Sequence, residues 1–418
     1  MKSFFSTVLA VIVAFISLWV LGFGLLILVS VFTSGDEAPK VKENTLLHLK
    51  LNAPIEERGS TDPFAGLDFV SLEPTTALGM NDLMLGLEAA AKDDRVAGVL
   101  LDMGSFSAGY GHLEELGDYL GAFKESGKKI YTYGEFYTQK GAYLAALADS
   151  AILHPGGLMD LRGVGVSITY YKDFFDKYGI EPVIVRGTGN DYKSAVEPYI
   201  SNEMSEANRD QLTVLINHFW NFVKTPFNQR GLSDADVDQL ANNWTGMDPE
   251  ALLATGAIDG LGYREDVMEA FEERFEVYPW EDYSSQVTQE TAQDRIAVIY
   301  ANGTIGNGSG DEQTIGTKNI VNALKKAEEN SRVKAIVLRV NSPGGSALTS
   351  DMIHHAIASV EKPVVVSQAN YAASGGYYIS CNADAIFTNS TTITGSIGIF
   401  MQFFSAAPFM NNTLGLHI

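Results

Sequence analysis

An order of apolar strands and helices that occurs twice is the strongest constraint on the fold of this chain. The segment "DRVAGVLLDM" (94–103) is similar to "SRVKAIVLRV" (331–340), and "YTQKGAYLAALADSAIL" (137–153) is similar to "YAASGGYYISCNADAIF" (371–387). A separation of about 235 residues is far longer than the period of a solenoid and indicates two duplicated domains.

The first copy alternates strands and helices. Apolar runs of strand length alternate with segments whose apolar residues recur at helical spacing. The predicted strands are 96–103, 128–136 and 150–155, and the predicted helices are 113–127 and 140–148. Buried parallel strands joined by helices fit this order, so the sequence predicts an α/β fold.

Domain boundaries follow from the two copies. The first domain is expected over residues 44–275 and the second over 295–418. The segment 276–294 is polar, lacks sustained periodicity and is predicted to be a linker. The region corresponding to 190–275 has no counterpart in the second copy, so we expect the second domain to be incomplete at its C-terminal end.

The N-terminal segment is predicted to be a membrane anchor. Residues 3–35 contain no charged side chain and are long enough to span a bilayer. A cleaved secretory signal would have a shorter apolar core and a small-residue cleavage site. Residues 1–35 are therefore expected to form a cytoplasmic N-terminus and a single transmembrane helix. Lys2 favours this orientation, whereas Lys40 and Lys42 weaken the charge contrast.

Charge and cysteine content exclude some partners. The formal net charge of −22 argues against nucleic acid as a partner. The single cysteine, Cys381, excludes an intrachain disulfide, and we expect a buried, inert thiol early on the helix that follows Ser374. We expect no metal and no cofactor.

The two copies differ at one informative place. Ser374 follows two alanines and precedes two glycines, a setting that suits either a nucleophile needing clearance or a tight strand-to-helix turn. Lys140 takes the place of Ser374 in the first copy. The first copy also has "GSFSAG" (104–109) where the second has the glycine turn "NSPGG" (341–345). This asymmetry is expected if one copy carries a nucleophile and the other supplies a different group.

A serine nucleophile needs a base, and histidine is the usual one. The seven histidines are His48, His112, His154, His218, His354, His355 and His417. His354 and His355 lie on the helix after the glycine turn, but adjacent helix residues point to different faces. Both are expected to be solvated or capped. Lys193 is the other candidate, because "GTGNDYKSAVEPYIS" (187–201) surrounds it with small and apolar residues that make burial possible.

Four motifs together resemble one family. "DYKSAVEPY", "NSPGG", "YAASGGYYIS" and "TGSIGIF" are similar to those of the signal peptide peptidases of the protease IV type, in the long, duplicated bacterial form. The resemblance implies tandem crotonase-like (ClpP-like) domains, with Ser374 as nucleophile and Lys193 as general base. It also implies a homo-oligomer, a tetramer in the family, anchored in the bacterial inner membrane with its catalytic part outside the cytoplasm. Its expected substrates are released signal peptides and other apolar peptides.

The chemistry of these residues agrees with that assignment. A lysine acts as a base only when neutral, so burial or a nearby cation must lower its pKa from about 10.4. Gly344 or Gly345 could present an amide to the developing oxyanion, and the sequence does not distinguish them. Ser396 could orient the lysine amine, although an ordinary turn serine fits equally well. An extended peptide could bind as an additional strand.

Two other classes of protein remain open. A crotonase-fold enzyme acting on acyl-CoA would use the same glycine turn without a serine–lysine pair, but it would need a basic surface for the CoA phosphates. The predicted anchor and the acidity of the chain count against it. A catalytically silent membrane scaffold would not need both Ser374 and Lys193. The sequence therefore favours a membrane-anchored serine peptidase.

Overall fold

The computed structural model divides the chain into two compact units, Met1–Lys42 and Glu43–Ile418. The residues it describes are 13–19, 21–22, 40–59, 77–287, 292–311 and 313–417. Most of the expected anchor, 3–35, lies outside the described residues, and its described parts are helical with exposed side chains. Within the described residues, no helix combines the length and the apolar character needed to cross a membrane.

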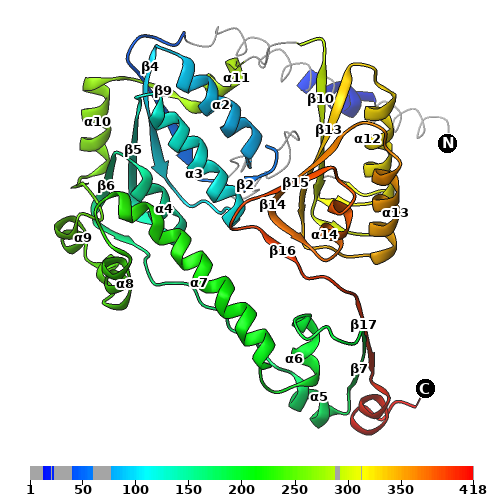
Figure 1. The fold of residues 1–418 in the computed structure, drawn as a ribbon. Helices are drawn as coiled ribbons and strands as arrows, with labels where there is room; N and C mark the ends of the chain where they lie inside the picture. Colours follow the sequence, from blue (N-terminus) through cyan, green and yellow to red (C-terminus); the bar gives the residue numbers. More distant parts are fainter. Residues whose placement is uncertain are drawn as a thin grey trace. The chain divides into compact units, whose positions relative to one another are not determined.

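The first sheet of the larger unit is six-stranded, in the order β8-β6-β5-β4-β1-β9, and every pairing is parallel (Figure 1). Its strands are β1 (Thr45–Leu51), β4 (Val96–Met103), β5 (Lys129–Tyr137), β6 (Ser150–Met159), β8 (Gly260–Leu261) and β9 (Glu276–Pro279). The helices that follow these strands include α2 (Met80–Lys92), α3 (Tyr110–Glu125), α4 (Gln139–Leu147) and α10 (Arg264–Arg274). β4 is buried along nearly its whole length, as a parallel strand covered on both faces requires.

The second sheet repeats this plan with the order β10-β13-β14-β15, and β16 also pairs with β14. Its strands are β10 (Arg295–Asn302), β13 (Val333–Ser342), β14 (Val364–Ala373), β15 (Ala385–Thr388) and β16 (Ile393–Gly395). Its helices are α12 (Thr317–Glu329), α13 (Ala347–Ala358) and α14 (Gly375–Ser380). Ile336, Leu338 and Ile353 are fully buried in its core. The predicted α/β class is therefore confirmed, with parallel strands and helices in the predicted order.

Shorter elements complete the larger unit. The remaining strands are β2 (Ile55–Glu56), β3 (Leu78–Gly79), β7 (Glu181–Arg186), β11 (Thr304–Ile305), β12 (Thr314–Ile315) and β17 (Phe400–Ser405). The remaining α-helices are α5 (Lys172–Tyr178), α6 (Glu197–Ile200), α7 (Glu206–Gln229), α8 (Asp234–Asn242), α9 (Pro249–Thr255) and α11 (Trp280–Gln286). The turns η1 (Ser194–Val196), η2 (Thr245–Met247) and η3 (Phe409–Thr413) are not α-helical.

The start of the expected linker is part of the first sheet. β9 pairs with β1, and α11 follows it directly. Trp280 and Tyr283 of α11 are buried, and the Trp280 ring lies so close to Gly86 of α2 that a Cβ at Gly86 would come within 2.5 Å of it. Aromatic anchoring of this short helix explains why residues 276–286, although polar and aperiodic, form a strand and a helix. Residues 288–291 lie outside the described residues.

A pair of strands brings distant parts of the sequence together. β7 pairs with β17 in antiparallel register, from Arg186 opposite Phe400 to Glu181 opposite Ser405 (Figure 1). β7 precedes the predicted base segment 187–201, and β17 follows the turn that contains Ser396. The pairing therefore places the base segment beside the end of the serine-bearing sheet.

Candidate active site

Ser374 occupies a sharp turn between β14 and α14. Its backbone has φ 52° and ψ −114°, a conformation that a residue with a side chain rarely adopts. Its N–H donates to the Gly395 carbonyl at 2.8 Å, and its own carbonyl accepts from the Tyr378 N–H at 2.9 Å. Such backbone strain costs about 1–3 kcal/mol and is concentrated at functional sites. The turn therefore marks Ser374 as a candidate nucleophile.

The small neighbours of Ser374 are required by packing. A Cβ on Gly375 would lie 2.5 Å from the Ser350 hydroxyl, and one on Gly376 would lie 2.6 Å from the Ser342 carbonyl oxygen. Both glycines are buried against these groups. The tight strand-to-helix turn is therefore present, and it holds Ser374 in its strained conformation.

The glycine turn after β13 lies directly against Ser374. Gly344 has φ +95°, and its N–H donates to the Ser342 hydroxyl at 3.1 Å. The Gly345 N–H has no hydrogen-bond partner among the described residues. Gly375, as the first residue of α14, has an amide that the helix itself leaves unpaired, and a Cβ on Gly344 would lie 2.6 Å from its nitrogen. The Gly345 and Gly375 amides are thus the available donors beside Ser374.

Lys193 is buried, with only 7% of its surface exposed. Its Nζ donates to the Ser396 hydroxyl at 2.9 Å and also to the Ser396 carbonyl. Burial lowers the pKa of the Lys193 amine from its ordinary value. No carboxylate forms an ion pair with Lys193 in the described part of the chain, so no anion there opposes this effect by stabilising the charged form.

Ser396 and Gly395 connect the lysine to the serine. Gly395, the last residue of β16, accepts the Ser374 N–H, and the next residue, Ser396, accepts from Lys193. Ser396 also has a positive φ of 47°, so its backbone is strained like that of Ser374. Between residues 40 and 417, as far as they are described, no hydrogen bond joins the Ser374 hydroxyl to the Lys193 amine. The two groups share one local framework without a direct hydrogen bond.

A buried polar cluster behind Lys193 was not predicted from the sequence. The Glu197 carboxylate accepts from the Ser205 N–H at 3.3 Å, from the Ser205 hydroxyl at 2.5 Å and from Asn208 Nδ2 at 3.0 Å. The Ser194 hydroxyl donates to Asn208 Oδ1 at 2.8 Å. Ser205 is the N-cap of α7, so the cluster ties the residues that follow Lys193 to the start of that helix. A serine three residues before an asparagine, a pattern found at helix N-termini, was the available signal.

The two histidines on α13 make other contacts. The His354 ring lies 4.7 Å from the Tyr378 ring, and its Nδ1 is 3.3 Å from Asn382 Nδ2. His355 is exposed. In the described residues no histidine forms a hydrogen bond with Ser374.

The prediction of a buried Cys381 is wrong. The thiol is exposed, because α14 ends at Ser380 and Cys381 is its C-terminal cap rather than a residue of its inner face. Its thiol donates to the Tyr377 carbonyl at 3.2 Å.

Comparison with known proteins identifies the family. The profile of Peptidase family S49 matches residues 122–278 and 356–416, just over half of the chain. Protease 4 of Haemophilus influenzae is 33% identical over 347 residues, which cover 77% of this chain and 56% of that protein. The chloroplastic serine protease SPPA of Arabidopsis thaliana is 32% identical over 351 residues, 79% of this chain and 51% of that protein.

One solved structure is also similar. A membrane-bound stomatin-specific protease with a substrate peptide is 10% identical, covers 55% of this chain and 80% of that chain, and has a TM-score of 0.32. The chain spans about half the length of the curated relatives it matches. On the profile match and the extent of identity, the chain belongs to peptidase family S49.

Proposed function

We propose that this chain is a serine endopeptidase in which Ser374 is the nucleophile and Lys193 the general base. The observation that carries the proposal is the framework at Gly395 and Ser396. Gly395 accepts from the strained Ser374, and Ser396 accepts from the buried Lys193 amine. A buried lysine that forms no ion pair with a carboxylate among the described residues is the kind of amine that can be neutral and remove a proton.

The proposed reaction uses the groups around this framework. Neutral Lys193 takes the proton of the Ser374 hydroxyl as Oγ attacks the substrate carbonyl. The oxyanion that forms accepts hydrogen bonds from the Gly345 and Gly375 amides rather than from Gly344, whose N–H is already bound to Ser342. The charged lysine then protonates the leaving amine, and water hydrolyses the acyl-serine. The hydroxyl and the amine must come together when substrate binds, as catalytic hydrogen bonds in free enzymes often do.

The proposed substrates are extended apolar peptides, chiefly signal peptides already cleaved from their precursors. The family motifs support this class of substrate, as does the surface next to Ser396. Ile397 and Ile399 are each 67% exposed on the segment that joins the lysine contact to β17. A peptide lying along this segment would cover them while its backbone pairs as a strand.

We further propose the wider arrangement that the sequence predicts. Two crotonase-like domains, 44–275 and 295–418, would follow a transmembrane anchor within residues 1–35. The chain would act as a homo-oligomer, a tetramer as in the similar family, on the outer side of the bacterial inner membrane. The two parallel sheets with the same strand order and the uncharged run from 3 to 35 support this arrangement.

Four single substitutions test the proposed dyad. Ser374→Ala and Lys193→Ala should each reduce hydrolysis of an apolar signal-peptide substrate by about 10³-fold or more, because each removes a group needed in the same step. His354→Ala and His355→Ala are the matched controls and should retain most of the activity. Substantial turnover by the Lys193→Ala protein would rule out the dyad.

A further inference from the structure

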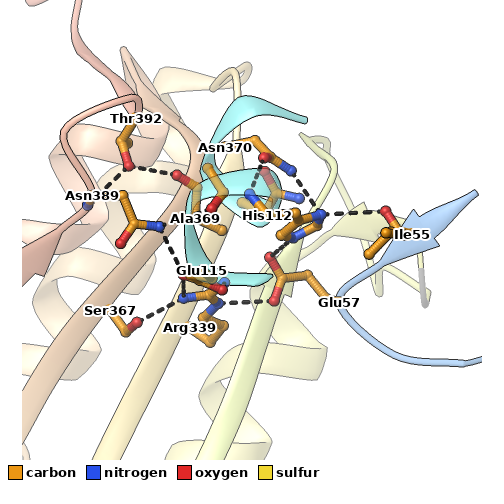
Figure 2. Close-up of polar contacts among 12 residues, drawn as sticks. Ile55, Glu57, His112, Glu115, Arg339, Ser367, Ala369, Asn370, Asn389 and Thr392 are labelled. Atoms are coloured by element: carbon orange, nitrogen blue, oxygen red, sulfur yellow. Dashed lines mark hydrogen bonds and ion pairs between the residues drawn. The ribbon is translucent and has the colours of Figure 1, made fainter. Parts of the chain in front are cut away.

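Helix α3, which follows β4 of the first sheet, contacts the strand that precedes Ser374. The backbone N–H of His112 donates to Asn370 Oδ1 at 2.9 Å, and His112 Nδ1 lies 3.1 Å from Asn370 Nδ2 (Figure 2). Asn370 belongs to β14, which ends at Ala373 immediately before the serine. His112 is only 1% exposed, so this contact is made in the interior of the protein.

The same helix also binds the loop 389–392, which leads into β16. The Glu114 carboxylate accepts from the Ser390 N–H at 3.0 Å, from the Thr391 N–H at 2.8 Å and from the Thr391 hydroxyl at 2.6 Å. Glu115 accepts from Asn389 Nδ2 at 2.8 Å. Burial raises the pKa of Glu114, but the hydrogen bonds from Thr391 and Ser390 outweigh it and keep the pKa below its usual value. Glu114 therefore holds this loop as a carboxylate.

Arg339, a residue of the second sheet, also binds α3. Arg339 of β13 donates through two nitrogens to the two Glu115 oxygens, each at 2.8 Å, and through Nε to Glu57 at 2.8 Å (Figure 2). Glu57 in turn lies 2.7 Å from His112 Nε2. Paired, planar contacts of this kind define an orientation as well as a distance. Figure 2 shows Arg339 between the carboxylates of Glu57 and Glu115. These contacts fix the position of α3 relative to β13 of the second sheet.

The loop held by α3 is the direct support of the lysine contact. Three residues after Thr392 the chain reaches Gly395, which accepts the Ser374 N–H, and then Ser396, which accepts from Lys193. Lys193 comes from a segment 203 positions away from Ser396. The position of Ser396 thus depends on what anchors the loop. The Thr392 hydroxyl, which donates to the Ala369 carbonyl at 2.6 Å, and the pairing of β16 with β14 hold it to the second sheet. Glu114 and Glu115 add an anchor from the part of the chain that also carries Lys193.

We propose that Glu114 and Glu115 are positioning residues that set the location of Ser396 and thereby keep the Lys193 amine buried and ready to accept a proton. This inference rests on the proposed function of Ser374 and Lys193. Loosening the loop would let water reach the amine. Because burial is what lowers the pKa of Lys193, hydration raises that pKa and the neutral base is formed only at higher pH.

Glu114→Gln is the main test, in the full chain. The glutamine keeps the size of the side chain but turns an NH₂ group toward backbone N–H donors. We expect kcat to fall about 10- to 100-fold, as a small misplacement of reacting groups can do, with KM nearly unchanged. The basic limb of the pH–rate profile should move to higher pH. Glu125→Gln is the matched control, because Glu125 is an exposed residue at the end of the same helix.

A second pair of variants keeps the test informative if Glu114→Gln does not fold. Thr391→Val removes the hydroxyl that donates to Glu114, whereas Thr391→Ser keeps a hydroxyl at this position. We expect the valine variant to move the basic limb in the same direction and the serine variant to return it to the parent position. The inference would be overturned if the variants had a lower melting temperature but kept the parent's basic limb in the pH–rate profile and the parent's kcat per active serine. That result would show a purely structural role.

The same measurements separate this inference from the proposed dyad. If Ser374→Ala retained activity, the proposed function would fail. If parent activity required Ser374 and Lys193 while Glu114→Gln and Thr391→Val kept the parent pH profile, only the positioning role would fail. A shifted limb in both variants, with an unshifted limb in Glu125→Gln, supports the inference.

Discussion

Gly344→Ala should damage the site without removing any functional group. Gly344 has φ +95°, and a Cβ there would lie 2.6 Å from the Gly375 nitrogen, 2.7 Å from the Ala373 carbonyl oxygen and 2.9 Å from Ser374 Cβ. All three distances are under the 3.0 Å that real Cβ atoms essentially never cross. None of these atoms is the end of a flexible side chain, so the backbone around Ser374 must move.

The expected magnitude has two parts. An alanine in the left-handed region costs about 1–2 kcal/mol relative to glycine. Forcing extra volume into a packed site costs typically about 1–3 kcal/mol more. The free energy of unfolding should therefore fall by about 2–5 kcal/mol. The displacement of Ser374 should reduce kcat by about 10²-fold, because a shift near 1 Å in a reacting group has an effect of that size.

Gly231→Ala is the matched control for this prediction. Gly231 has φ +85°, and a Cβ added there would meet no other atom within 4 Å, so its alanine variant incurs only the backbone cost. Urea unfolding followed by tryptophan fluorescence gives the stability, and hydrolysis of an apolar peptide gives kcat. The reasoning would be refuted if the Gly344→Ala protein lost no more stability and no more activity than the Gly231→Ala protein.

Three further substitutions have distinct expected results. Glu197→Gln should lower the free energy of unfolding by about 1–3 kcal/mol in urea titration, because it disrupts buried hydrogen bonds to a charged group. Ser396→Ala should reduce kcat by about 10-fold in the peptide assay, since Lys193 keeps the Ser396 carbonyl as an acceptor but loses the hydroxyl. Hydrogen bonds from His48 and Arg264 outweigh burial and lower the pKa of Asp102 from 3.8 to about 2. Its carboxylate therefore stabilises the fold above pH 4 by about 2 kcal/mol, and urea titrations should show this advantage over Asp102→Asn disappear as the pH falls toward 2.

Local sequence patterns were sufficient to predict many of the strands and helices. The buried strands and the helices after them are signalled by runs of apolar residues, and β4 and α4 begin and end within one residue of the strand predicted at 96–103 and the helix predicted at 140–148. The candidate residues Ser374 and Lys193 could also be chosen from the sequence, because the first stands among small residues and the second among small and apolar ones.

Contacts between distant segments could not be predicted. The bonds from Arg339 to Glu57 and from His112 to Asn370 join residues 282 and 258 positions apart, and no periodicity marks such pairs. The availability of the Gly345 amide, rather than that of Gly344, depends on a hydrogen bond from Gly344 to the Ser342 hydroxyl that only the folded turn reveals. The burial of Trp280 against Gly86 of α2 is likewise not marked by any pattern in the sequence.

Labelling of Ser374 with a fluorophosphonate tests the central claim most directly. The adduct is located by mass spectrometry, and its rate of formation is measured against pH in the parent and in Lys193→Ala. We predict that Ser374 is the labelled residue, and that the parent rate rises along one basic limb without a limb near the ordinary histidine value of about 6.5. The Lys193→Ala protein should lose that limb and nearly all labelling. Equal labelling of the two proteins, or an adduct on another serine, would contradict the account.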